Sequence, residues 1–114
     1  VVTQEAGTAE AVLLRAVEPV KGIQAMRRRR PKAKRDVDLT NGPGKICMAM
    51  DIDRKLDGER LAGGRLWITA RDIEEPEIVV TPRIGIENSG EAATWPLRFF
   101  IRGNRFVSAY RNVR

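Results

Sequence analysis

The sequence lacks most of the residue types from which metal and nucleophilic sites are built. Its 114 residues contain no histidine and one cysteine, Cys47. A single cysteine excludes an internal disulfide, and without histidine no cysteine–histidine metal set can form. There is also no histidine to activate Cys47 as a nucleophile. With its apolar neighbours, Cys47 is expected to be a small core residue of a reduced, intracellular protein.

Long apolar runs are lacking as well. No stretch approaches the roughly 20 apolar residues that a membrane span needs, and the first residues do not form a signal peptide. We therefore expect no membrane partner and an intracellular location, in the cytoplasm or nucleoid of a bacterium or the nucleus of a eukaryote. The hydrophobic share of 42% fits a folded protein, and 114 residues leave room for one domain with a modest core.

Basic residues outnumber acidic ones, 21 to 15, and they are concentrated in one segment. Lys21 to Arg35 holds eight basic residues and no acidic residue, a local charge of +8, whereas the rest of the chain sums to −2. Such a block attracts polyanions by releasing their counterions, without base specificity. A solvated loop that only keeps the protein soluble, or a localisation signal, would have the same composition.

The first half of the chain is predicted to hold one strand and two helices. Residues 9–17 are apolar apart from two charged positions and are typical of a largely buried strand. Residues 22–30 are predicted to form a short helix that ends before Pro31, with its arginines facing outward. The charged stretch 31–38 is expected to be a mobile basic loop, and a second helix is predicted over residues 43–50.

The second half is predicted to be mainly strands. The candidates are residues 65–70, residues 78–86 and residues 97–102, with a short return at 105–108. The turn residues between them favour antiparallel connections. The pattern predicts an α+β fold, with short helices packed on a curved antiparallel sheet. If this sheet lacks strands, its open edge would make the 114 residues marginally stable and prone to aggregate.

The turn that leads into the second helix has the composition of a phosphate site. Asn41 is predicted to cap the helix, and Pro43 suits its first position. Gly42 and Gly44 have no Cβ, so another molecule can approach the backbone closely. Unpaired N–H groups at a helix start, together with Lys45, would suit a phosphate. Many helices with the same caps bind nothing, and the pattern alone leaves that alternative open.

Six segments occur in an order that resembles the alkyladenine (3-methyladenine) DNA glycosylase family, from Gly7 to about Ser108. They are Gly7–Arg15, Val17–Val20, Gly22–Arg27, Leu39–Lys45, Thr81–Ile86 and Pro96–Asn104. The resemblance covers nearly the whole chain but only part of the family's domain. Members of the family normally carry an upstream half with the catalytic glutamate, a histidine and base-stacking tyrosines. The chain is therefore expected to be the C-terminal portion, residues 1–114, of a single glycosylase domain whose upstream half supplies further strands.

The resemblance assigns two residues to the catalytic centre. Arg15 matches the family arginine that lies beside the catalytic glutamate and helps to hold the attacking water. From the strand pattern alone, Arg15 could equally form a buried ion pair or lie at an edge in solvent. Ile84 matches the position whose main-chain carbonyl is a further partner of the water, although by its own pattern it is an ordinary strand residue.

The resemblance also assigns four positions to DNA contact, and Arg83 is a further candidate. Lys45 matches a phosphate-contacting lysine, with Gly44 allowing close approach, and Arg54 matches a second backbone contact. Arg30 matches a basic position on the outer helix, and Arg83 is placed next to the catalytic carbonyl. Phosphate contacts would position the protein without reading sequence. For Arg30 and Arg54 a solvated surface is the alternative, and for Arg83 an ion pair.

The implied reaction is hydrolysis of the N-glycosidic bond of an alkylated or deaminated purine that is flipped out of double-stranded DNA. A general base must activate the water, and because guanidinium stays protonated, Arg15 cannot take that role. The chain alone is therefore expected to be inactive. The protein completed by its upstream half is expected to act as a monomer, without cofactor or metal. The alternative is a non-catalytic module that binds nucleic acid through its basic surface. Trp67 and Trp95 are expected to be packing residues rather than base-stacking platforms.

Overall fold

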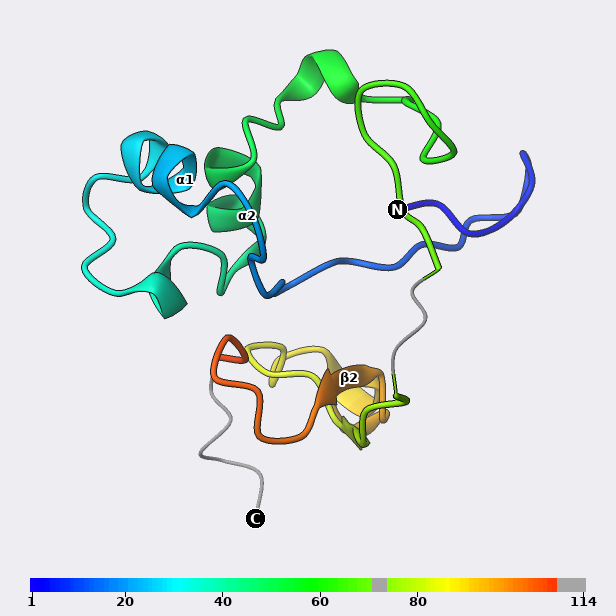
Figure 1. Ribbon diagram of the computed structural model, residues 1–114. Coiled ribbons are helices and arrows are strands. Elements are labelled where there is room, and N and C mark those ends of the chain that lie inside the picture. The colour runs from blue at the N-terminus through cyan, green and yellow to red at the C-terminus, as the bar shows by residue number, and fades with distance from the viewer. Residues whose placement is uncertain (71–73, 109–114) are drawn as a thin grey trace. The chain divides into compact units, whose positions relative to one another are not determined.

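The computed structural model describes residues 1–70 and 74–108. Clustering of the chain gives two compact units, Val1–Thr69 and Ala70–Arg114. Helices α1 and α2 belong to the first unit, and strands β1 and β2 belong to the second (Figure 1). The α+β class predicted from the sequence is confirmed, with a two-stranded antiparallel sheet as the β part of the described residues. Short 3-10 turns occur at Asp36–Asp38, Arg54–Leu56 and Gly90–Thr94.

Helix α1 spans Ile23–Arg29, within one residue of the predicted bounds. Gly22 precedes it with a φ of 77°, a conformation that a residue with a Cβ rarely adopts. The C-cap is Arg30, directly before Pro31, which could not continue the hydrogen-bond ladder. The three arginines of its last turn are exposed, as predicted.

Helix α2 spans Pro43–Ala49, also close to the prediction. Its N-cap is Gly42 and not Asn41, because Gly42 has the extended backbone of a cap and its carbonyl accepts the first helical N–H at 2.9 Å. The helix ends in a Schellman motif, in which the Ile52 N–H donates to the Cys47 carbonyl at 2.8 Å.

The core of the first unit lies where α1 packs against α2 and the loop that precedes α2 (Figure 1). Leu39, Ile46 and Ala49 are buried there. Thr40 is completely buried, and its hydroxyl donates to the Val17 carbonyl at 2.7 Å. Because Ile46 and Ala49 are three positions apart, they share one side of α2. Cys47 lies on another side and is exposed, so the prediction of a core cysteine is wrong.

The prediction of a buried strand over residues 9–17 is also wrong. One antiparallel bridge, Val2 with Ala11, closes an N-terminal hairpin, and the next anchor is the Val17 N–H, which donates to the Thr40 carbonyl at 3.3 Å. Between these anchors the described residues supply no neighbouring strand, so the apolar side chains stay in solvent. Leu13, for example, is 67% exposed.

In the second unit, β1 (Ile78–Thr81) pairs antiparallel with β2 (Arg98–Ile101). Side chains of a strand alternate between two faces. On one face Val79 and Phe100 lie opposite each other and are buried, together with Phe106. The other face carries Ile78, Val80, Phe99 and Ile101, all substantially exposed. The sheet therefore has one covered face and one bare apolar face within the described residues.

Three strand predictions were too long or wrong. Strand β1 does not run on to residue 86, because Pro82 has no N–H to donate. Residues 65–70 do not form a strand, and a single bridge joins Ala62 to Trp67. The expected return strand at 105–108 is a series of turns.

Both tryptophans lie at the surface rather than in the core. Trp67 is 59% exposed, because an isolated bridge has no sheet face on which to pack it. Trp95 is 49% exposed at the end of the last 3-10 turn. The expectation that both are packing residues is therefore wrong for the described structure.

Candidate nucleic-acid interface

Lys45 lies in the first turn of α2, as the sequence predicted, and it is exposed. Its Nζ donates to Asn41 Oδ1 at 2.7 Å, so the residue expected to cap the helix instead orients the lysine. Gly44 is exposed, and a Cβ built on it would meet no atom within 4 Å. The backbone at Gly44 and the ammonium of Lys45 are therefore both accessible at the same end of α2.

Arg54 is exposed and begins the 3-10 turn that follows α2. That turn is fixed by Asp53, whose carboxylate accepts the Lys55 N–H at 2.9 Å. Within residues 1–70 and 74–108, the Arg54 guanidinium makes no hydrogen bond or ion pair. The structure thus places Arg54 and Lys45 on consecutive elements of the same unit.

Arg30 has a different position from the one predicted. It is half-buried at the end of α1, and its Nη1 donates to the carbonyls of Asp38 and, at 2.9 Å, of Leu39. Arg30 therefore fixes the backbone just before α2. This structural use was not predicted, because the carbonyls that receive the hydrogen bonds are brought near only by the tertiary fold.

Other arginines of the basic segment are also held by nearby acceptors. Arg27 forms an ion pair with Asp36, and Arg35 forms one with Asp38 at 3.0 Å. The hydrogen bond from Arg35 lowers the pKa of the Asp38 carboxyl. The sequence carries a signal for these pairs, since the two aspartates directly follow the basic run.

Arg15 is exposed in the extended segment before Val17, not buried in a strand. This exposure excludes a buried ion pair, which is one of the alternatives that the sequence leaves open for Arg15. Within the described ranges its guanidinium has no hydrogen-bonding partner. The neighbouring side chains Leu13 and Leu14 are also exposed, so Arg15 lies in an apolar stretch that faces solvent.

Ile84 and Arg83 lie beyond the end of β1 and not in a strand. Ile84 is in a bend, and Arg83 is in the irregular stretch before it. Gly85, with a φ of 78°, follows Ile84, and its N–H donates to Glu87 Oε1 at 3.2 Å. Arg83 is exposed. These residues belong to the second unit, and Arg15 belongs to the first.

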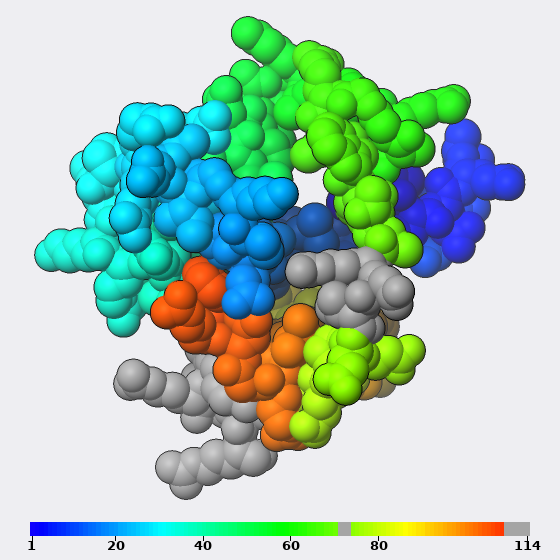
Figure 2. All heavy atoms as spheres, in the orientation of Figure 1, coloured from blue at the N-terminus to red at the C-terminus, as the bar shows by residue number. Residues whose placement is uncertain are grey.

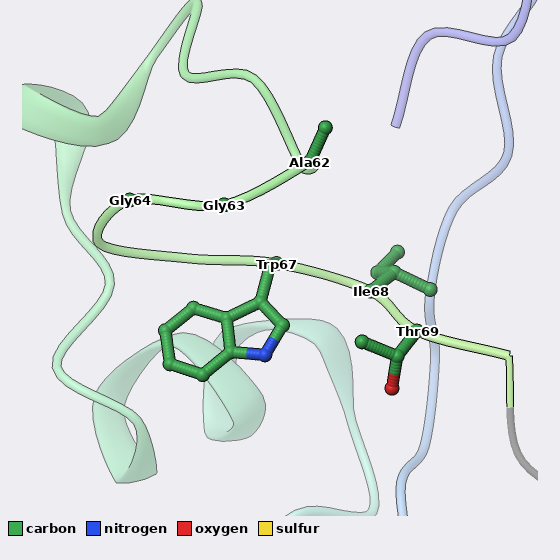
Figure 3. Close-up of a pocket in the computed structure, with 6 residues that line it drawn as sticks. All are labelled: Ala62, Gly63, Gly64, Trp67, Ile68 and Thr69. Atoms are coloured by element: carbon green, nitrogen blue, oxygen red, sulfur yellow. The ribbon is translucent and has the colours of Figure 1, made fainter.

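A shallow hollow of about 390 Å³ lies against the hairpin that ends the first unit (Figure 3). It is lined by Ala62, Gly63, Gly64, Trp67, Ile68 and Thr69. None of these residues has an ionisable side chain. The hollow could accept an apolar or aromatic group against Trp67, but its lining contains no acid or base for catalysis.

Residues 1–70 and 74–108 contain neither a metal-binding cluster nor a membrane-spanning helix. No group of three or more histidine, cysteine, aspartate or glutamate side chains lies close enough together to bind a metal ion. None of the helices has the length and apolar character that a bilayer crossing requires. Asp51 and Asp53, which resemble a metal pair in sequence, serve the local turns: Asp51 follows α2 with a φ of 57°, and Asp53 caps the next turn.

The chain is similar in sequence to one protein family over most of its length. The model of the family described as methylpurine-DNA glycosylase matches residues 1–105. A provisionally named 3-methyladenine DNA glycosylase of Lactiplantibacillus plantarum is 47% identical over 109 residues, which are 95% of this chain and 51% of the relative. A provisionally named DNA-3-methyladenine glycosylase of Encephalitozoon cuniculi is 47% identical over 110 residues, 94% of this chain and 52% of the relative. The chain thus spans about half the length of these curated relatives.

Proposed function

The chain belongs to the methylpurine-DNA glycosylase family, and from this premise we propose that it is one half of a base-excision-repair glycosylase. The reaction would be hydrolysis of the N-glycosidic bond of an alkylated or deaminated purine in double-stranded DNA. The family match over residues 1–105 carries this proposal, and the names of the relatives support it. In this assignment the chain supplies one part of the active site and part of the DNA-binding surface.

In the proposed mechanism the damaged nucleotide is first rotated out of the duplex, because its glycosidic carbon cannot be attacked within the base stack. A water molecule then attacks that carbon while a general base removes its proton. Arg15 would hold this water by donating hydrogen bonds, with the Ile84 carbonyl accepting one. A guanidinium remains protonated, so Arg15 cannot be that base. The family resemblance assigns the role to a glutamate carboxylate. We place that carboxylate in the half of the domain that the chain does not match.

The exposure of Arg15 supports its role in this scheme. Its guanidinium has no acceptor among the described residues and is available to a water or a carboxylate brought by another part of the domain. A positively charged donor beside the general base would also keep that carboxylate ionised. Ile84 contributes only its backbone, which the bend before Gly85 leaves outside the β-ladder.

The proposed contacts to the DNA backbone centre on α2 and the turn after it. Lys45 would reach a phosphate, and Gly44 would let the phosphate approach the backbone without a steric clash. Arg54 would contact a second phosphate from the following turn. Arg83 and Arg30 are also proposed to contact the DNA backbone. Only part of the Arg30 guanidinium is available for this, because Nη1 donates to the Leu39 carbonyl.

The partners follow from the same assignment. The other half of the domain would pack against the chain, and the completed protein would act as a monomer on duplex DNA, inside the cell where the DNA lies. The bare face of the β1–β2 sheet and the apolar residues around Leu13 are the surfaces that such a half would cover. Covering them would remove apolar side chains from water, which stabilises the assembled domain.

The experiment joins this chain to the part of the Lactiplantibacillus plantarum relative that it does not match. Single-turnover release of hypoxanthine or a methylated purine from a duplex is then measured for this fusion, for its Arg15→Ala variant and for a control, Arg60→Ala. We expect the fusion to release the base. The Arg15→Ala variant should release it about 100-fold more slowly, because the water is misplaced. The Arg60→Ala control should release it at the rate of the fusion. A fusion that folds and binds DNA but releases no base would refute the glycosylase and favour the non-catalytic binding module.

A further inference from the structure

The basic segment, Lys21 to Arg35, is divided by the structure into two groups of cations. One group is used inside the protein: Arg27, Arg29, Arg30 and Arg35 each donate to an oxygen of the first unit. The other group makes no hydrogen bond or ion pair within the described ranges. It consists of Lys21, Arg28, Lys32 and Lys34, all exposed.

The bonded arginines connect α1, the loop after it and α2. Arg29 Nη1 donates to the Ala49 carbonyl at 2.9 Å, at the C-terminal end of α2. The pairs with Asp36 and Asp38 fix the middle of the loop. A planar guanidinium has five donors in a fixed geometry, which suits it to bind carboxylates and carbonyls in this way. These four arginines therefore have a structural use that does not require a ligand.

Three of these four cations, Arg28, Lys32 and Lys34, lie close together along the chain. Arg28 is in the last turn of α1, and the Ala33 N–H donates to the Arg30 carbonyl at 3.0 Å, so the chain turns directly after the helix. This turn keeps Lys32 and Lys34 beside the helix end. In the space-filling view the segment, coloured light blue to cyan, lies at the surface with long side chains extending into solvent (Figure 2).

The local acidic groups cannot neutralise these three cations. Asp36 and Asp38, the two carboxylates nearest in sequence, are already paired with Arg27 and Arg35. Three like charges on neighbouring residues repel one another unless an anion lies between them. A chain of phosphates meets this need, because each contact also releases condensed counterions.

We propose that Arg28, Lys32 and Lys34 form a second contact surface for the phosphodiester backbone of duplex DNA, separate from Lys45 and Arg54. The choice of duplex DNA as the polyanion rests on the proposed function. A lipid surface fits less well, because α1 has only seven residues and no broad apolar face that could enter a bilayer. The surface would extend the footprint on DNA without contributing to sequence or lesion recognition.

The test measures binding of the 114-residue chain to an undamaged fluorescent duplex over a series of salt concentrations. The variant Arg28→Gln/Lys32→Gln/Lys34→Gln removes the proposed contacts. The matched control, Arg27→Gln/Arg29→Gln/Arg35→Gln, removes the same charge from the bonded arginines. A second control, Lys32→Arg/Lys34→Arg, keeps the charge. Circular dichroism and thermal melting show whether each variant is folded.

We expect the first variant to remain folded and its plot of log K against log salt to flatten by about 2 to 3, since each lost phosphate contact removes about 0.9 from the slope. The bonded-arginine variant should lose stability while, in its folded fraction, the slope changes by less than about 1. Lys32→Arg/Lys34→Arg should keep the slope of the unmodified chain. An unchanged slope in the first variant, or an equal loss in both charge-removing variants, would overturn the proposal.

The same measurements distinguish duplex DNA from an anionic lipid surface as the partner. They also distinguish failure of the DNA contact surface from failure of the proposed glycosylase activity. Vesicles with an anionic lipid are added as competitor, and binding of vesicles but not of DNA through these residues would overturn the assignment. Base release is not measured in this series. A failed release test in the fusion protein, together with a flattened slope here, would refute the glycosylase and leave the DNA contact surface standing.

Discussion

At the scale of single residues, Thr40 connects the loop before α2 to the extended segment that ends at Val17. Its side chain is fully buried, and its hydroxyl donates to the Val17 carbonyl at 2.7 Å, while the Val17 N–H returns a longer bond to the Thr40 carbonyl. A buried carbonyl that loses its donor keeps the cost of its dehydration. The extended segment that carries Arg15 is anchored at this point, so Thr40 also fixes the backbone two residues after the exposed Arg15.

We predict that Thr40→Val lowers the free energy of unfolding by about 1 to 3 kcal/mol, because the shape is kept and the hydrogen bond is lost. Urea denaturation, followed by tryptophan fluorescence, measures the change. Thr40→Ser retains the hydroxyl and serves as the control. Equal stability of the valine variant and the unmodified chain would contradict this account of the Thr40–Val17 contact.

Asp51 has a strained backbone conformation at the end of α2. Its φ of 57° lies in the left-handed region, where residues with a Cβ are disfavoured and glycine is not. We predict that Asp51→Gly raises the free energy of unfolding by about 0.5 to 1 kcal/mol, whereas Asp51→Ala lowers it. Thermal melting of both variants tests this, and a less stable glycine variant would show that the Asp51 carboxylate has a further role.

At the scale of secondary-structure elements, the local signals for the two helices are sufficient to predict them. Pro43 and the following residues predict the start of α2, and Pro31 predicts where α1 ends. Strand β1 is predicted at its start but not at its end, because Pro82 has no N–H with which to continue the ladder. Elements whose evidence is local are therefore found from the sequence.

Elements that depend on a distant partner are not found in the same way. Residues 9–17 have the composition of a buried strand, but burial requires a neighbouring strand that the described residues do not supply. The structural roles of Arg29 and Arg30 depend on carbonyls brought near by the fold. The sequence placed Lys45 correctly at the start of α2 but did not predict its bond to Asn41.

The bare face of the β1–β2 sheet has a measurable consequence. Val80 and Phe99 are paired across the sheet on this face, and Phe99 is 64% exposed. We predict that the 114-residue chain self-associates through it, because apolar surface is removed from water when two such faces meet. Val80→Lys/Phe99→Lys should shift the chain to monomer without loss of stability, as measured by sedimentation velocity and thermal melting.

The control for this prediction lies on the opposite face of the same strands. Val79→Lys would bury a charge beside Phe100 and should unfold the second unit. A monomeric unmodified chain at concentrations near 100 μM, in the range where exposed apolar surface normally drives association, would show that the bare face is not adhesive.

At the scale of the whole molecule, the chain spans about half the length of its curated relatives. It matches 51% of the Lactiplantibacillus plantarum relative while 95% of its own length is aligned. In the proposed function, its exposed apolar residues and Arg15, which has no partner among the described residues, would contact a further part of the domain. In the proposed function the basic segment, Lys45 and Arg54 would supply positive charge for DNA. No histidine is present in the chain, and we assign the general base to the remaining half.

The central claim is that these 114 residues hold part of a glycosylase site without its general base. It is tested most directly by single-turnover release of hypoxanthine from duplex DNA, measured side by side for the chain alone and for its fusion to the unmatched part of the Lactiplantibacillus plantarum relative. We predict no release above the uncatalysed rate for the chain and clear release for the fusion. Release by the chain alone at a rate close to that of the fusion would contradict the account, since it would place the general base within these residues.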